Sequence, residues 1–270
     1  MLNKEPTLFI FEGSRTEDKV VHMLERNFLG EKVALTCVYD AEIYQLYQRL
    51  KEDNFALDIV NLLKERSLQN AEKLKDCNRD TFAYVYLFFD YDAHSTLADD
   101  DKIIELLDFF DNETDNGMLY ISYPMVEAIR HYKDMESFKT LTVKCKKQKC
   151  VYQNECMDKD DCFAEPHYKA FVPTDCRPQL VNVNSFTREI WNELILAHLC
   201  KMNYLINDEY VFPESISKQS IVFNKQLEKY INHRCPRVAV LSAFPMYVLD
   251  YYGISKMQEK LDEYRSHIQY

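Results

Sequence analysis

The chain contains very little glycine. It has four glycines in 270 residues. A loop that cradles phosphate with backbone N–H groups needs several glycines close together, and the sequence contains neither a P-loop motif nor the GxGxxG motif. Nucleotide hydrolysis through a P-loop is therefore excluded.

Long apolar runs are also missing. No stretch approaches the roughly 20 apolar residues that cross a bilayer, and the N-terminal residues Met1–Glu5 lack the apolar block of a signal peptide. We therefore expect a soluble cytoplasmic protein with no membrane partner. In that compartment the nine cysteines are interpreted as reduced thiols.

An excess of positive charge is absent as well. Lys and Arg number 33 against 44 Asp and Glu, which gives a formal net charge of −11. Because neutralising phosphates requires clustered Lys and Arg, this balance argues against holding nucleic acid by charge alone. It leaves open binding through metal ions or a basic partner. The basic run Lys144–Lys149 is interpreted as a solvated loop face.

Carboxylates end three apolar runs of the sequence. The runs are Thr7–Gly13 with Glu12, Tyr84–Asp92 with Asp90 and Asp92, and Leu119–Glu127 with Glu127. A side chain at the end of a parallel strand lies at the sheet edge where ligands of open α/β sheets bind. The three runs therefore predict one acidic site.

Strands and helices are expected to alternate along the first half of the chain. We predict strands at residues 7–11, 33–39, 82–89 and 118–123, and helices that begin at Ser14, after residue 39, at Asp99 and near Pro124. The run at 82–89 is apolar throughout, which is typical of a strand covered on both faces. The predicted fold class is α/β, a parallel sheet with helices on both faces.

The composition changes after residue 140. Residues 141–184 are rich in Cys, Pro and charge and show no clean period, so we interpret them as an insertion or linker. Helical patterns return at residues 185–205 and 215–233 and after Gly253. We therefore expect an α/β domain at residues 1–140 and a mostly helical C-terminal region at residues 185–270.

The carboxylates at the first two strand ends predict a cation site. Asp90 and Asp92 are two residues apart, so in an extended strand both would face the same side. Together with Glu12 from a neighbouring strand they would repel one another without a cation. Mg²⁺ prefers oxygen ligands and is held by a few carboxylates, water and substrate phosphate. This pattern favours metal-assisted phosphoryl transfer, with Mg²⁺ or Mn²⁺ as cofactor.

These motifs resemble the TOPRIM domain family of topoisomerases, bacterial primases and OLD-family nucleases. The residues that carry the resemblance are Glu12–Glu17 after the first strand and Asp90–Asp92 after the second motif strand. The segment Tyr123–Ile129 is similar to the element that follows Asp-x-Asp in OLD-like and phage-defence TOPRIM proteins, although Glu127 lacks the Asn that follows it there. The resemblance covers roughly residues 5–135, about half the chain.

The resemblance implies a compact four-stranded parallel sheet that holds one or two Mg²⁺ ions. It implies that Glu12 is a metal ligand or general acid/base and that Asp90 and Asp92 are metal ligands. It makes Glu127 and Glu17 candidate ligands of a second metal, although Glu17 also fits a capping box with no further role. His94 is interpreted as a solvated loop histidine.

The cysteine-rich segment raises the alternative of structural zinc. Its candidate ligands are Cys145, Cys150, Cys156, Cys162, His167 and Cys176. Zinc sites usually contain a tight C-x₂₋₄-C pair, and the first spacings here are four, five and five residues. Ordinary thiols are therefore favoured over zinc.

The leading functional hypothesis is a Mg²⁺-dependent TOPRIM nuclease that cleaves DNA or RNA. By the same resemblance it would be the effector of a bacterial anti-phage defence system and would work with an ATPase partner. One alternative is an RNA-processing enzyme similar to the TOPRIM maturase of small ribosomal RNA. Another is a non-catalytic TOPRIM module that binds a partner through its helical C-terminal third.

Overall fold

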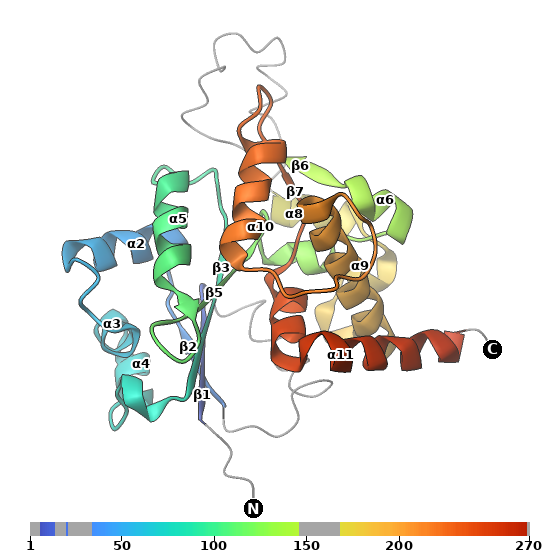
Figure 1. Cartoon of the computed structure of the whole chain (residues 1–270). Helices are drawn as coiled ribbons and strands as arrows, with labels where there is room; N and C mark the ends of the chain where they lie inside the picture. The colour runs from blue at the N-terminus through green and yellow to red at the C-terminus, as the bar shows by residue number, and fades with distance from the viewer. Residues whose placement is uncertain (1–5, 14–19, 21–33, 146–167, 269–270) are drawn as a thin grey trace, which may run out of the picture. The chain divides into compact units, whose positions relative to one another are not determined.

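The computed structural model describes residues 6–13, 20, 34–145 and 168–268 (Figure 1). The chain forms two compact units. Unit 1 comprises Met1–Asp90 and Leu97–Ile121, and unit 2 comprises Tyr91–Thr96 and Ser122–Tyr270. The second unit thus begins about twenty residues before the expected boundary at 140 and includes a short segment from within the expected α/β domain.

Unit 1 is built on a mostly parallel five-stranded sheet. In spatial order its strands are β2 (Ala34–Val38), β1 (Thr7–Phe11), β3 (Tyr84–Asp90), β5 (Gly117–Ser122) and β4 (Asp111–Asn112). β1 runs parallel to both β2 and β3, whereas the two-residue β4 is antiparallel to β5. The resemblance implied four parallel strands, whereas this sheet has five, with the antiparallel β4 at one edge.

Four helices of unit 1 lie on one side of this sheet (Figure 1). They are α2 (Ile43–Glu52), α3 (Ile59–Arg66), α4 (Leu68–Lys73) and α5 (Asp100–Phe109), with a short 3₁₀ turn, η2 (Arg79–Thr81), before β3. Side chains cap three of the helix starts. Asp58, Ser67 and Asp99 accept hydrogen bonds from backbone N–H groups in the first turns of α3, α4 and α5.

Aromatic rings fill the sheet interior of unit 1. Phe11 stacks on Phe88 with ring centroids 5.2 Å apart, and Phe88 stacks on Tyr120 at 5.4 Å. Because these residues come from neighbouring strands, one layer of rings runs across β1, β3 and β5. All five residues of β1 are buried. This layer fixes the positions of the strand ends that carry Glu12 and Asp90.

Unit 2 is mostly helical. Its elements are η3 (Val126–Arg130), α6 (Met135–Thr140), β6 (Thr142–Lys144), α8 (Tyr168–Asp175), η4 (Pro178–Leu180), η5 (Val183–Ser185), α9 (Arg188–Asn207), α10 (Gln219–Gln226), the π-helical turn η6 (Leu227–Ile231), β7 (Arg237–Ala239) and α11 (Ala243–Ile268). The central α9 contacts α6, α10 and α11. α11 is broken at Gly253, whose φ of 73° is not helical.

The structure confirms the four predicted strands to within two residues at each end, and it confirms the helices at 185–205 and after Asp99. The helix predicted near Pro124 is wrong. After Tyr123–Pro124 the chain forms only the 3₁₀ turn η3, and the next α-helix begins at Met135, where the Asp134 side chain accepts a hydrogen bond from the Ser137 N–H at 2.8 Å. The helix predicted at Ser14 lies mostly outside the described residues, although Val20 from its expected inner face is buried.

One antiparallel strand pair of unit 2 was not predicted. β6 pairs with β7, and Thr142 lies opposite Ala239. β6 therefore joins the beginning of the supposed linker at 141–184 to the C-terminal region. Among the described helices, none is both long and apolar enough to span a membrane.

Candidate functional site

Glu12 and Asp90 lie together at the carboxyl ends of β1 and β3. The register pairs Phe11 with Phe88, and the Glu12 N–H donates to the Phe88 carbonyl oxygen at 3.0 Å. The Asp90 N–H in turn donates to Glu12 Oε2 at 3.0 Å. This bond holds one carboxylate oxygen of Glu12 beside the backbone of Asp90, whose own side chain is almost fully buried.

Asp92 belongs to unit 2 and departs from strand geometry. β3 ends at Asp90, and Asp92 has a φ of +44°, a left-handed conformation that few non-glycine residues adopt. The expectation that Asp90 and Asp92 share one side of an extended strand is therefore wrong. The Asp92 N–H donates to the Pro124 carbonyl oxygen at 3.2 Å, and its carboxylate lies 2.9 Å from Nδ1 of His94. His94 is half exposed, as expected of a loop, but contacts a predicted site residue.

Glu127 is the most deeply buried of the predicted site residues. It lies in η3 of unit 2 with no exposed surface. Within the described part of the chain, neither of its carboxylate oxygens has a hydrogen-bond donor. Two cations are nearby, Lys169 Nζ at 3.8 Å and an Arg130 guanidinium nitrogen at 4.0 Å. A buried carboxylate without a donor is costly, because burial removes the water that would solvate it.

The structure thus brings Glu12 and Asp90 together in unit 1 and places Asp92 and Glu127 in unit 2. Glu17 lies outside the described residues. Among the residues described, no three His, Cys, Asp or Glu side chains are grouped as a metal site. Of the candidate zinc ligands only Cys145 and Cys176 are described, so the zinc hypothesis stays a prediction.

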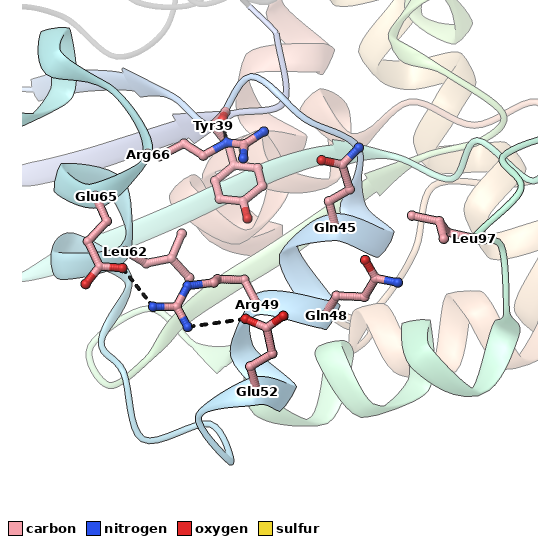
Figure 2. Close-up of a pocket in the computed structure, with 9 residues that line it drawn as sticks. All are labelled: Tyr39, Gln45, Gln48, Arg49, Glu52, Leu62, Glu65, Arg66 and Leu97. Carbon is pink, nitrogen blue, oxygen red and sulfur yellow. Dashed lines mark hydrogen bonds and ion pairs between the residues drawn. The ribbon is translucent and has the colours of Figure 1, made fainter.

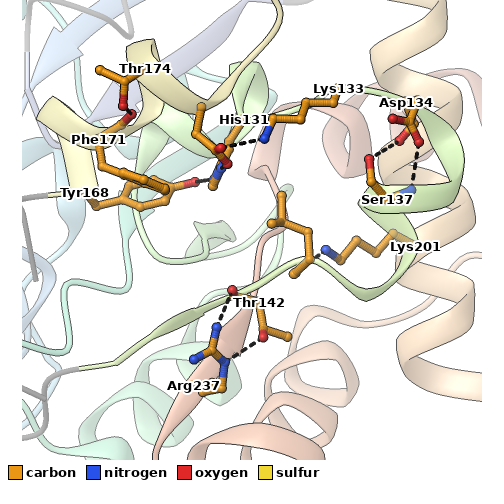
Figure 3. A network of polar contacts seen from close by, with 12 residues as sticks. His131, Lys133, Asp134, Ser137, Thr142, Tyr168, Phe171, Thr174, Lys201 and Arg237 are labelled. Atoms are coloured by element: carbon orange, nitrogen blue, oxygen red, sulfur yellow. Dashed lines mark hydrogen bonds and ion pairs between the residues drawn. The ribbon is translucent and has the colours of Figure 1, made fainter. Parts of the chain in front are cut away.

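A polar cluster in unit 2 was not predicted from the sequence (Figure 3). His131 is buried, with Nδ1 3.0 Å from the Tyr168 hydroxyl and Nε2 3.0 Å from Asp175. Lys133 also bonds to Asp175. Burial lowers the pKa of His131 against the opposing effect of Asp175. Burial would raise the pKa of Asp175, but hydrogen bonds from Lys133 and His131 outweigh it and hold that pKa below its usual value.

Helix α9 buries two further basic side chains. Lys201 is almost fully enclosed, donates a hydrogen bond to the Leu141 carbonyl oxygen, and lies over the Phe138 ring at 4.3 Å. Burial lowers its pKa well below the ordinary lysine value. His198 is fully buried and accepts a hydrogen bond at Nδ1 from the Ser242 N–H at 3.1 Å. Burial and nearby Lys201 lower the pKa of His198 to about 3.

The sequence contained a weak signal for the buried His198 and Lys201. α9 is apolar around nearly its whole circumference, so a His and a Lys three residues apart on it had no polar face to occupy. The partners of His131 could not be found in this way, because Tyr168 and Asp175 are 37 and 44 residues away.

Comparison with known proteins found no match: no family model matches the chain, and neither a curated protein nor a solved structure matches it significantly. Any functional proposal therefore depends on the geometry of the described residues.

Proposed function

We propose that this chain is a Mg²⁺-dependent nuclease that hydrolyses phosphodiester bonds in DNA or RNA. The observation that supports the proposal best is the pairing of Glu12 and Asp90 at the ends of two adjacent parallel strands. Ligands of open α/β sheets bind at this edge, and carboxylates there are suited to hold a hard divalent cation.

The donor set fits a hard cation because it consists of carboxylate oxygens. Glu12 and Asp90 would hold the ion, and Asp92 follows two residues later in a left-handed conformation of the kind that clusters at functional sites. A bound divalent cation would neutralise phosphate charge and lower the pKa of a water molecule. Glu127 and Glu17 remain proposed ligands of a second ion; the Glu127 oxygens accept no hydrogen bond among the described residues, although Lys169 and Arg130 lie within 4.0 Å of Oε1.

The chain's own groups would prepare this site before substrate binds. The Asp90 N–H fixes Glu12 Oε2, so the Glu12 carboxylate is oriented without help from the ligand. Ring stacking between Phe11 of β1 and Phe88 of β3 holds the two strands together next to these ends. This arrangement lowers the entropic cost of binding, because few groups must be ordered later.

A cleavage assay tests this proposal. The purified chain is incubated with Mg²⁺ or Mn²⁺ and with mixed DNA, tRNA and rRNA, beside the variants Glu12→Gln and Asp90→Asn. Each variant should lose at least about a hundredfold in rate, because each removes charge where the phosphate charge is neutralised. The matched controls Glu72→Gln and Asp108→Asn change exposed acids of unit 1 and should cleave like the wild type.

Equal cleavage by the wild type and the Glu12 and Asp90 variants would contradict the proposal. A single defined cut in one precursor RNA would instead favour the RNA-processing alternative. Absence of cleavage together with absence of Mg²⁺ binding by calorimetry would favour the non-catalytic module.

The proposed defence role depends on the TOPRIM resemblance alone. An effector of that kind would be restrained by an ATPase partner until infection. A gene for an ATPase beside this one, and co-purification of the two products, would support the role. Free cleavage in growing cells without any partner would argue against restraint.

A further inference from the structure

Unit 1 contains a pocket of about 400 Å³ outside the carboxylate site (Figure 2). Helices α2 and α3 form its walls, and Tyr39 and Leu97 complete them. Pockets of this size take small organic ligands. Nothing in the proposed nuclease chemistry uses it.

The pocket lies beside the strand end that carries Glu12. Tyr39 directly follows β2, and its N–H donates to the Phe11 carbonyl oxygen at 2.8 Å. The next residue, Asp40, donates its N–H to the Glu12 carbonyl oxygen at 2.9 Å. Tyr39, which lines the pocket, therefore lies at the carboxyl edge of the sheet, where α/β proteins bind ligands.

The charges that line the pocket are already compensated. Arg49 lies 2.8 Å from Glu65 and 3.6 Å from Glu52. Arg66 donates to the carbonyl oxygens of Tyr39 and Asp40 and stacks over the Tyr39 ring at 5.0 Å. Two cations and two anions leave the lining neutral overall. A phosphate ligand is disfavoured, because it would have to compete with Glu65 and Glu52 for Arg49.

Two amide side chains supply the unused hydrogen-bonding capacity. Gln45 and Gln48 are three residues apart, so both lie on the face of α2 that lines the pocket. In Figure 2 no dashed line joins either side-chain amide to another residue of the pocket, and Gln48 is exposed while Gln45 is half-buried. Each amide offers both donors and an acceptor. Leu62 and Leu97 add apolar surface.

We propose that this pocket binds an unstacked nucleobase through the amides of Gln45 and Gln48. A nucleobase is flat and uncharged, and its edge carries donors and acceptors that an amide can match. The base can come from the substrate strand of the proposed nuclease or from a free nucleotide. Only the first source rests on the proposed function.

Binding measurements test this inference with the full chain in EDTA, so that no metal is needed. The probes are the four ribonucleosides, their 5′-monophosphates, and RNA tetramers of each base, with ribose 5-phosphate and inorganic phosphate as base-free controls. At least one nucleoside should bind. Gln45→Leu and Gln48→Leu should each weaken it at least tenfold, whereas Gln69→Leu, a change at an exposed glutamine of α4, should not.

The two sources are separated by affinity. A tetramer that binds at least tenfold more tightly than its nucleoside indicates a base of a strand, and equal affinities indicate a free nucleotide. The inference is overturned if no base-containing probe binds, if both Gln variants bind like the wild type, or if inorganic phosphate competes with the nucleoside. Because the assay contains no metal, a failed cleavage assay leaves this result unaffected, and an active nuclease without base binding overturns the pocket alone.

Discussion

The two units of this chain differ in what they bury. In the described part of unit 1 the only acidic or basic side chain in the interior is Asp90, at the end of a strand, and aromatic rings fill the rest of the sheet layer. Unit 2 buries Glu127, His131, His198 and Lys201. Unit 1 thus depends mainly on apolar packing, whereas the stability of unit 2 is coupled to the protonation of the buried His198 and Lys201.

The two units can be followed separately. The single tryptophan, Trp191, is fully buried in α9, so its fluorescence reports the unfolding of unit 2. Far-UV circular dichroism reports both units. A difference between the two signals therefore measures the difference between the units.

Lowering the pH should give the largest change in the stability of unit 2. The pKa of His198 is about 3 in the fold against 6.5 for an ordinary histidine. Between these values the unfolded chain binds a proton that the folded chain excludes, so stability falls as pH falls. The loss should be about 3 kcal/mol between pH 7 and pH 4. Urea unfolding followed by Trp191 fluorescence measures it.

The control for this prediction is His198→Asn. The Asn oxygen can still accept from the Ser242 N–H but does not titrate. This variant should show a shallower dependence of unit 2 stability on pH. A wild type and a variant with the same slope would show that His198 is not the group responsible.

Replacing the buried Lys201 should give the next largest change in stability, and this change should be a gain. The folded chain lowers the pKa of Lys201, so at pH 7 folding must work against the protonation that the unfolded chain prefers. Lys201→Met should therefore stabilise unit 2 by roughly 1–3 kcal/mol. The Leu141 carbonyl oxygen keeps its bond from the Val240 N–H, so it is not left without a donor.

A Lys→Met change at an exposed position of unit 1 tests whether the gain in stability comes from removing a buried charge. Lys75 is exposed, and Lys75→Met should change stability by less than about 0.5 kcal/mol. The measurement is chemical unfolding at pH 7, followed by both signals. Destabilisation by Lys201→Met would show that the amine contributes more than it costs.

A glycine tests the apolar packing of unit 1. Gly117 has a φ of +129°, and a Cβ there would lie 2.7 Å from Leu87 Cδ1 and 3.2 Å from Val85 Cγ1. Gly117→Ala should destabilise unit 1 by about 1–3 kcal/mol through strain and overpacking. Gly253 also has a positive φ but has no atom within 4 Å of such a Cβ, so Gly253→Ala measures the backbone effect alone. Equal losses of stability by Gly117→Ala and Gly253→Ala in thermal unfolding would show that overpacking contributes nothing at Gly117.

Helix caps should give the smallest effect, similar in the two units. The Asp58 side chain accepts from the Asn61 N–H at 2.9 Å, and Thr187 accepts from the Ile190 N–H at 3.3 Å. Asp58→Ala and Thr187→Ala should each cost about 1 kcal/mol, with the longer bond of Thr187 giving the smaller loss. A cost well above this range in one unit, measured by urea unfolding, would show that its cap does more than end a helix.

The sequence predicted elements whose causes are local. The strand at Tyr84–Asp90 is apolar throughout, and the helix after Asp99 has a capping side chain and an acidic first turn, so neighbouring residues determine both. β6 and β7 were missed because each has three residues and its partner is about 95 residues away. The α-helix expected near Pro124 is only the 3₁₀ turn η3, whose N-cap Met125 makes no side-chain cap bond, and the next α-helix is capped by Asp134.

In the candidate site, too, the features with local causes could be predicted and those that depend on distant segments could not. The pairing of Glu12 with Asp90 could be predicted, since adjacent parallel strands end at the same edge. The left-handed turn at Asp92 could not, because it depends on the bond to the Pro124 carbonyl oxygen, contributed by a distant segment. The pocket between α2 and α3 could not be predicted either, because it depends on how two helices pack.

The short segment Tyr91–Thr96 has a consequence for dissecting the protein. It belongs to unit 2, where the Tyr91 N–H donates to the Ser122 carbonyl oxygen and the Tyr91 ring packs against Tyr123 and Phe223. The chain therefore passes from one unit to the other three times. A fragment cut after Ile121 would carry Tyr91 without these partners and expose its ring to water. No single cut in the backbone can release either unit intact.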